Sequence, residues 1–272
     1  MDTPYQVGPD IHVLPTSLPL PGVGILPVNA YVIRAEEPVL VDSGIGLDSD
    51  DFMDALASIV DPAELRWIWL THDDADHTGS IRRVMAAAPR ARLVTNAFAA
   101  LRMATWWPVP LDRVHAIRVG DAIDAGDRTL RAVAPPLFDN PLSIGVLDES
   151  TGALFTVDAF GAILPAVVED VADVEPEALA GGMLGWATSD SPWAHLVDRE
   201  RFGQVLARVQ DLQPTRILSS HLPAASGDAL GHLLQVLERV PDAEPFVPPG
   251  YEQFGHLLAA LAHQAEPVGA SA

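Results

Sequence analysis

The residues with the clearest capacity for chemistry form one short stretch, His72–His77, which reads His-Asp-Asp-Ala-Asp-His. Five of its six side chains can bind a metal ion. The stretch follows Trp67–Leu70, an apolar run typical of a strand buried on both faces. At the carboxyl end of such a strand, where α/β folds place their sites, alternate side chains can converge on one point. Unpaired ligands beside an apolar core are costly without a cation. We therefore favour a metal site over a solvated acidic turn with incidental histidines.

The composition limits what could hold that metal. Cysteine is absent, and all 16 basic residues are arginine. Disulfides, thiol nucleophiles, Fe–S clusters and thiolate metal sites are therefore excluded, as are a lysine Schiff base and a lysine phosphate loop. Any metal must be held by His, Asp, Glu or backbone oxygen.

The charge and hydropathy of the chain exclude several partner classes. The formal net charge is −21 and the sequence pI about 4.5, which argues against a nucleic-acid surface and against docking on anionic membranes. No apolar run approaches the roughly 20 residues of a membrane helix. The start of the chain lacks the basic and apolar regions of a secretory signal, so we expect a cytoplasmic protein.

The order of apolar patterns predicts the architecture. Strand-like runs lie at 11–15, 30–34, 39–41, 67–70, 92–95, 114–119, 129–134, 143–147, 153–157 and 216–219. Helical spacing occurs at about 48–60, 80–88, 97–105, 176–184, 199–212, 228–240 and 251–264. This order predicts an α/β fold, a four-layer αββα sandwich of two mixed sheets with outer helices. We expect one domain over residues 1–264 and a flexible tail over 265–272.

At this point the chain resembles the metallo-β-lactamase superfamily, whose signature is Thr-His-x-His-x-Asp-His-x-Gly. The matching residues are Thr71, His72, Asp74, Asp76, His77 and Gly79. Other family segments follow in the same order as in the superfamily: Asn29–Ile33, Val39–Gly44, Phe155–Gly161 with the bridging aspartate, and Leu218–His221 with the last histidine.

Two positions depart from the family pattern. Asp74 replaces the second histidine of the signature, and a carboxylate there is typical of the flavodiiron and oxygen-binding di-iron branch, although that branch carries Glu. The Asp-Ala-Phe-Gly of residues 158–161 is also similar to that branch. A histidine expected about nineteen residues before Asp158 is missing, and Asp139 stands in its place.

The resemblance implies two metal sites. Site one would use His72, Asp74, Asp139 and bridging Asp158; site two would use Asp76, His77, Asp158 and His221. A carboxylate-rich set favours Fe or Mn over Zn, so we expect two Fe ions, with Mn or Zn as alternatives. Four carboxylates and two divalent ions sum to zero (−4 + 4). A bound water should then be less acidic than at a histidine-rich centre, which favours redox or O₂ chemistry over hydrolysis.

Three functions stay open from the sequence. The first is a non-haem di-iron protein that binds O₂ or performs redox chemistry on a small molecule. Only 51 residues follow His221, too few for a flavin domain, so an external electron donor or the organic substrate would supply electrons. The second is a metal-dependent hydrolase of an ester, lactone, thioester or β-lactam, and the third a metal-poor binding protein. Asp76 and His77 are the predicted catalytic residues.

Several other side chains have secondary expectations. Asp42 should bond loop amides near the site, and Asp73 should face solvent or cap the following helix. His195 is a weak candidate for the pocket wall. Four tryptophans could line an apolar cleft or lie in the core: Trp106, Trp107, Trp186 and Trp193. Apolar helices at Leu230–Leu237 and Leu257–Leu261 could pack internally or form a homodimer interface.

Overall fold

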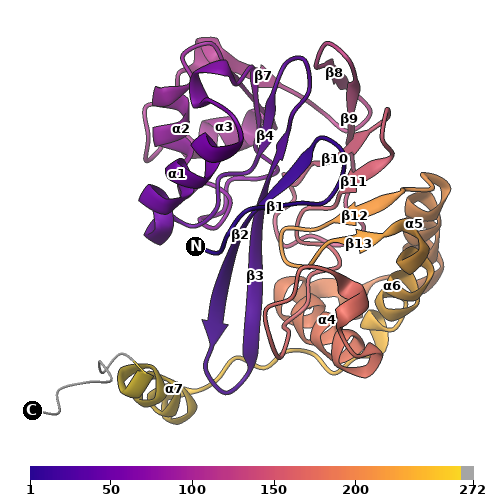
Figure 1. Ribbon diagram of the computed structural model, residues 1–272. Helices are drawn as coiled ribbons and strands as arrows, with labels where there is room; N and C mark the ends of the chain where they lie inside the picture. The colour runs from indigo at the N-terminus through magenta and orange to yellow at the C-terminus, as the bar shows by residue number, and fades with distance from the viewer. Residues whose placement is uncertain (265–272) are drawn as a thin grey trace, which may run out of the picture.

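The computed structural model describes residues 1–264, so the predicted tail at 265–272 lies outside the described residues. Two mixed sheets form the centre (Figure 1). The first sheet has the strand order β1 (Tyr5–Gln6), β2 (Ile11–Leu20), β3 (Gly24–Ile33), β4 (Val39–Val41), β5 (Trp67–Trp69), β6 (Arg92–Thr95) and β7 (Val114–Ala116). Strands β1 to β4 pair antiparallel and β4 to β7 parallel.

The second sheet has the order β13 (Ala225–Ser226), β12 (Arg216–Leu218), β11 (Ala153–Phe155), β10 (Gly145–Asp148), β9 (Thr129–Val133) and β8 (Ala122–Asp124). Strands β11 and β12 are parallel, and the other neighbours are antiparallel. The predicted mixed character of both sheets is therefore confirmed.

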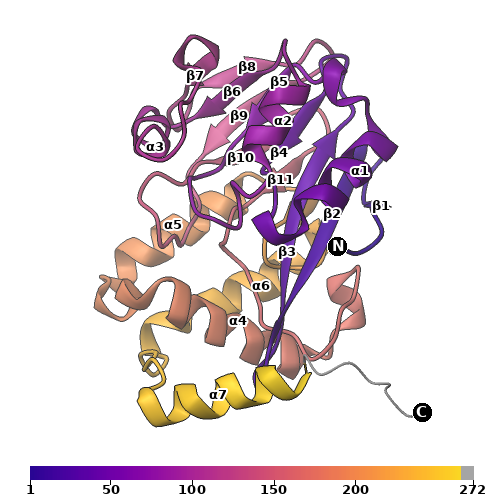
Figure 2. The same ribbon diagram turned by 90° about the vertical axis from the view of Figure 1, so that its left-hand side faces the viewer.

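Three apolar clusters separate four layers (Figure 2). One cluster fills the space between the sheets. A second joins the first sheet to α1 (Ser49–Ile59), α2 (Ile81–Ala87) and α3 (Ala97–Met103), and a third joins the second sheet to α4 (Pro176–Asp190), α5 (Arg199–Asp211) and α6 (Leu230–Leu237). This is the predicted αββα sandwich.

The structure differs most from the sequence prediction in the hairpin of β2 and β3. Predicted strands at 11–15 and 30–34 were too short: both strands have ten residues and pair along their whole length, from Ile11↔Ile33 to Leu20↔Gly24. The two strands contain three prolines, and proline cannot donate a ladder hydrogen bond. Apart from its two-residue pairing with β1, β2 is an edge strand of the sheet within residues 1–264, and an edge strand tolerates proline.

The structure decides between internal packing and a dimer interface for one of the two apolar C-terminal helices. α6 buries its leucines in the third cluster, so Leu230–Leu237 packs internally. α7 (Tyr251–Gln264) has the predicted bounds and lies outside the four layers, with Tyr251 and Phe254 exposed (Figure 1). A homodimer through α7 stays a prediction. Within residues 1–264, no helix combines the length and apolarity needed to cross a membrane.

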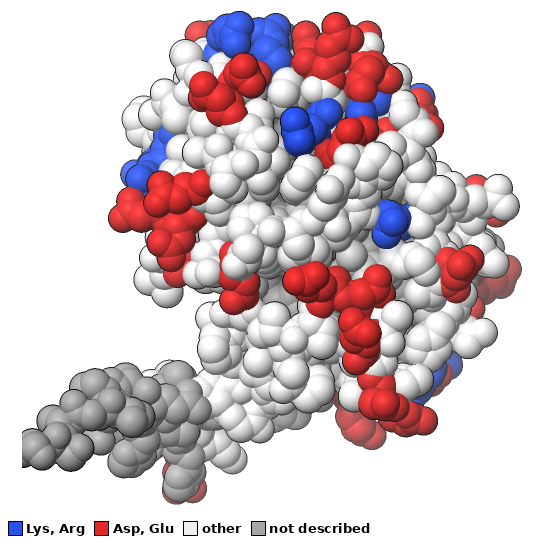
Figure 3. All heavy atoms as spheres, in the orientation of Figure 1, with Lys and Arg blue, Asp and Glu red and all other residues white. Residues whose placement is uncertain are grey.

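The surface reflects the charge balance of the sequence. Acidic side chains outnumber basic ones on the face drawn in Figure 3 and are spread over several patches. This agrees with 37 acidic against 16 basic residues in the chain.

Candidate metal centre

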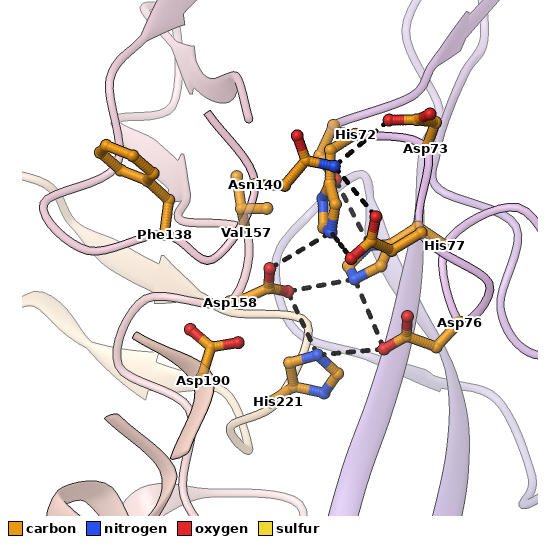
Figure 4. Close-up of polar contacts among 12 residues, drawn as sticks. His72, Asp73, Asp76, His77, Phe138, Asn140, Val157, Asp158, Asp190 and His221 are labelled. Carbon is orange, nitrogen blue, oxygen red and sulfur yellow. Dashed lines mark hydrogen bonds and ion pairs between the residues drawn. The ribbon is translucent and has the colours of Figure 1, made fainter. Parts of the chain in front are cut away.

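All seven ligands predicted from the sequence belong to groups of side chains that lie close together. Figure 4 shows His72, Asp76, His77, Asp158 and His221 of this set where the two sheets meet. Potential ligand atoms fall into groups whose members lie within 4.8 Å of one another. Three groups consist only of predicted ligands: His72–His77–Asp158, Asp76–His77–His221 and His72–Asp74–Asp139. They share members, as expected of two adjacent ion sites.

Strand register explains why distant residues meet. Phe155 of β11 pairs with Leu218 of the parallel strand β12. Asp158 and His221 each follow three residues after these partners, so both side chains leave the same edge of the second sheet. The loop that carries His72 and His77 follows β5 of the first sheet, at its carboxyl end. The two edges face each other across the space between the sheets.

Each histidine points its Nε2 atom at the centre because its Nδ1 atom is engaged elsewhere. Nδ1 of His77 lies 2.8 Å from Oδ2 of Asp42, and Nδ1 of His221 lies 2.8 Å from the carbonyl oxygen of Pro27. Nδ1 of His72 lies 3.2 Å from Oγ1 of Thr71. Such outer contacts fix the tautomer that leaves Nε2 free to bind a metal.

The Asp158 carboxylate faces all three imidazoles of the cluster (Figure 4). Its Oδ1 atom lies 3.0 Å from Nε2 of His77 and 3.1 Å from Nε2 of His221, and its Oδ2 atom lies 3.4 Å from Nε2 of His72. Oδ1 is fully buried, yet it has no partner in hydrogen-bonding geometry among the described residues. A buried oxygen without such a partner, beside ring nitrogens, fits a carboxylate that needs a cation.

Electrostatics link the ligands to one another. Burial alone would lower the pKa of His221, but Asp158 and Asp76 outweigh it and raise that pKa to about 10. Burial would likewise lower the pKa of His77, yet Asp158, Asp42 and Asp76 hold it well above its usual value. The His72 contact lowers the pKa of Asp74 to about 2, whereas burial and Asp158 raise that of Asp139 to about 6.

Metal binding should therefore release protons from the two histidines. A raised pKa stabilises the metal-free fold below pH 6.5, the ordinary histidine value, and this contribution is lost as pH rises toward 10. Because a metal needs neutral imidazole, we expect affinity to rise between pH 6 and 9, by up to about tenfold per pH unit for each proton released. Calorimetry in buffers of different ionisation enthalpy measures this release. An affinity that is flat over this range would contradict the prediction.

Asp42 supports the centre from outside, as expected from the sequence. It accepts hydrogen bonds from the backbone N–H and the hydroxyl of Thr71, at 2.8 and 2.9 Å, besides its contact with His77. In Asp42→Asn an amide N–H would oppose the Nδ1–H of His77 and favour the wrong tautomer. We expect metal affinity to fall about 10- to 100-fold, measured by competition with a chelator. The surface control Asp54→Asn should leave the metal affinity unchanged. If Asp42→Asn binds metal as tightly as the wild type does, Asp42 does not have this role.

Asp73 differs from expectation. Its side chain is only 3 % exposed, and its Oδ2 atom lies 2.8 Å from Nε of Arg102 on α3. The Asn140 amide donates to Asp73 Oδ1 at 3.2 Å and to Asp74 Oδ1 at 2.9 Å. The prediction that Asp73 faces solvent or caps a helix is therefore wrong, because the arginine and the amide compensate a buried carboxylate. Arg102 and Asn140, which sequence reasoning missed, hold the loop in place.

Residues from α4 complete the surroundings. The Trp186 ring lies 4.5 Å from the His221 ring, and its Nε1–H donates to the Asp158 carbonyl at 3.0 Å. Asp190 groups with Asp139 and Asp158, and burial together with these two carboxylates raises its pKa to about 7. No motif in the sequence marked Asp190. Among the described residues, His195 belongs to no group that could hold a metal.

Comparisons with known proteins agree with this geometry. The anaerobic nitric oxide reductase flavorubredoxin of Salmonella typhi is 31% identical over 134 residues, 49% of this chain and 28% of that protein. Flavo-diiron protein FprA2 of Clostridium acetobutylicum is 25% identical over 134 residues, 49% of this chain and 34% of that protein. The chain thus spans about a third or less of the length of these relatives.

The solved structures show the same fold. The rubredoxin oxygen:oxidoreductase from Desulfovibrio gigas superposes with a TM-score of 0.78 at 16% identity, over 90% of this chain and 63% of that one. The model of the metallo-beta-lactamase superfamily matches residues 23–221, which include the whole His72–His77 loop, Asp158 and His221. Because this match covers well over half of its length, the chain belongs to the metallo-β-lactamase superfamily.

Proposed function

We propose that this chain holds two iron ions and acts as an oxidoreductase on a small molecule such as O₂ or NO. The main support is the donor set around Asp158: four carboxylates and three imidazole nitrogens, without any thiolate. Oxygen-rich sets favour hard ions, and iron pairs supply reversible one-electron redox chemistry when bound. The names of two relatives, a flavo-diiron protein and a nitric oxide reductase, support the same reading.

The side chains would divide the work as follows. Asp158 would bridge the two ions, with His72, Asp74 and Asp139 on one side and Asp76, His77 and His221 on the other. Asp42 keeps the lone pair of His77 directed at the centre. Asp74 and Asp76 are each about one-third exposed, while the three histidines and Asp158 are buried. A substrate would therefore enter past the carboxylates of Asp74 and Asp76.

The route of the substrate and the source of electrons follow from this arrangement. O₂ or NO would approach the centre past the partly exposed carboxylates of Asp74 and Asp76. The reduction of O₂ or NO consumes electrons that the protein side chains cannot supply repeatedly. We propose a separate donor protein, or oxidation of an organic substrate, as their source. Asp76 would orient the bound small molecule. Its Oδ2 atom lies 3.6 Å from Nε2 of His77 and 3.3 Å from Nε2 of His221.

Metal analysis after anaerobic purification tests the proposal. We expect two Fe per chain and, on exposure to O₂, an oxo-to-iron absorption band. Two Zn per chain with turnover of an ester would support a hydrolase instead. A chain that binds no stoichiometric metal under replete conditions would refute both functions.

The role of Asp139 has its own test. Asp139→Ala should reduce the metal-to-chain ratio from two toward one, because Asp139 groups with His72 and Asp74 and not with the His221 side. Elemental analysis of the dialysed protein measures the ratio, and Asp54→Ala on the surface of α1 is the matched control. Equal loss from both sites, or no loss, would mean that Asp139 has not replaced the missing histidine.

A further inference from the structure

A second candidate binding site, which shares no residue with the predicted metal ligands, lies in a groove between β9 and α5. Its cavity volume is about 670 Å³, within the range of pockets that bind small organic molecules. The walls are mostly apolar and include Val133, Phe138, Trp193, Val205 and Val209. The Phe138 and Trp193 rings lie 5.2 Å apart, and the indole N–H of Trp193 donates to the Phe138 carbonyl at 3.0 Å.

The groove exists because α5 covers only part of the second sheet. α5 buries Phe202, Leu206 and Val209 in the apolar cluster between that sheet and its helices. Val205 lies on the same side of the helix but is only half-buried, as is Val133 on β9. Apolar side chains that remain accessible in a concave surface are typical of a ligand site.

The rim of the groove carries the opposite charge to the protein as a whole. Three of the 16 basic residues of the chain line it, against one of the 37 acidic residues. Arg131 is paired with Glu149, and the one acidic residue, Asp198, caps α5 by accepting from the backbone N–H of Arg201. Arg201 and Arg208 are exposed, and within residues 1–264 neither guanidinium has a carboxylate partner.

Either Arg201 or Arg208 can meet a ligand that lies in the groove. They are seven residues apart on α5, which is two helical turns and roughly 10 Å along the axis, so they share one face. The residues that line the groove from α5 are Arg201, Phe202, Val205, Arg208 and Val209, an apolar stripe with a guanidinium near each end. A long apolar groove with cations at its rim matches a ligand with an apolar chain and one anionic end.

We propose that this groove binds a medium-chain fatty carboxylate, with the alkyl chain between β9 and α5 and the carboxylate paired with Arg201 or Arg208 at one end of the apolar stripe. The chain of the ligand buries apolar surface that the fold leaves accessible. The carboxylate gains charge-assisted hydrogen bonds in a protein whose net charge is −21. None of the predicted metal ligands lines the groove, so the proposal does not depend on the proposed function.

Calorimetric titration of the full chain with laurate and with methyl laurate tests the proposal. We expect laurate to bind at least tenfold more tightly than its uncharged ester. The double variant Arg201→Glu/Arg208→Glu should weaken laurate binding at least tenfold and leave ester binding unchanged. The control Arg34→Glu/Arg239→Glu makes the same charge change at exposed arginines that do not line the groove. It should bind laurate as the wild type does.

Tryptophan fluorescence locates the ligand. Laurate should change the emission of the wild-type protein, and Trp193→Phe should remove most of that change while retaining binding. Equal affinity for acid and ester, wild-type affinity in the double variant, or no binding of laurate would overturn the proposal. So would a dimer that Val205→Glu converts to a monomer, because a second copy of the chain would then cover the groove.

Discussion

Replacing Asp158 with alanine should abolish binding of both metal ions. Among the described residues, Asp158 is the one candidate ligand that lies within 3.5 Å of Nε2 of His72, His77 and His221 together. A bridging carboxylate contributes to both sites, so its loss cannot be confined to one of them. We expect the metal-to-chain ratio to fall from two to near zero, measured by elemental analysis and by calorimetric titration with Fe(II) under anaerobic conditions.

The same substitution should also change the metal-free protein. The raised pKa values of His77 and His221 depend on Asp158, so these buried imidazoles lose their main compensating charge. Removing one partner of a buried ion pair costs about 3–5 kcal/mol. Chemical unfolding with a chelator present measures that cost, and Asp158→Asn, which keeps the side-chain volume, separates charge from packing. Asp211→Asn on the surface of α5 is the control. Retention of one tightly bound ion in Asp158→Ala would argue against a bridge.

The contiguous part of the site was the most predictable from sequence. His72 to His77 are six neighbours in the chain, and the apolar run before them marked a buried strand end. Asp158 and His221 could be assigned only by resemblance, since nothing local says that β11 and β12 are parallel neighbours. The structure brings them together through the pairing of Phe155 with Leu218. Their role as ligands stays a prediction.

The residues that support the loop could not be predicted in the same way. Arg102 lies on α3 and Asn140 lies between β9 and β10, and their contacts with Asp73 exist only after both sheets have assembled. A local pattern assigned Asp73 to solvent because alternation turns it away from its neighbours. Tertiary contacts overrode that pattern. The local rule was sound, and the missing information was which distant element packs beside the residue.

Gly79, the last residue of the signature, should tolerate no side chain. A Cβ atom there would lie 2.2 Å from the backbone nitrogen of Gly46 and 2.4 Å from the carbonyl oxygen of Gly44. The loop is held against this segment by backbone hydrogen bonds, from Gly79 to Gly44 at 2.8 Å and from Ser43 to His77 at 2.8 Å. Because the colliding atoms are all backbone, no change of rotamer can relieve the contact. The two segments would have to separate, and His77 would move away from Asp42.

We therefore expect Gly79→Ala to lower the free energy of unfolding by about 3 kcal/mol, the upper range for overpacking, and to weaken metal binding as well. Gly185→Ala is the matched control. A Cβ atom at Gly185 meets no heavy atom within 4 Å, and alanine in the middle of α4 should raise stability by about 1 kcal/mol. Urea unfolding of both variants with a chelator present separates the packing effect from metal loss. If Gly79→Ala unfolds at the wild-type urea concentration, the close approach of the two loops does not determine the geometry of the site.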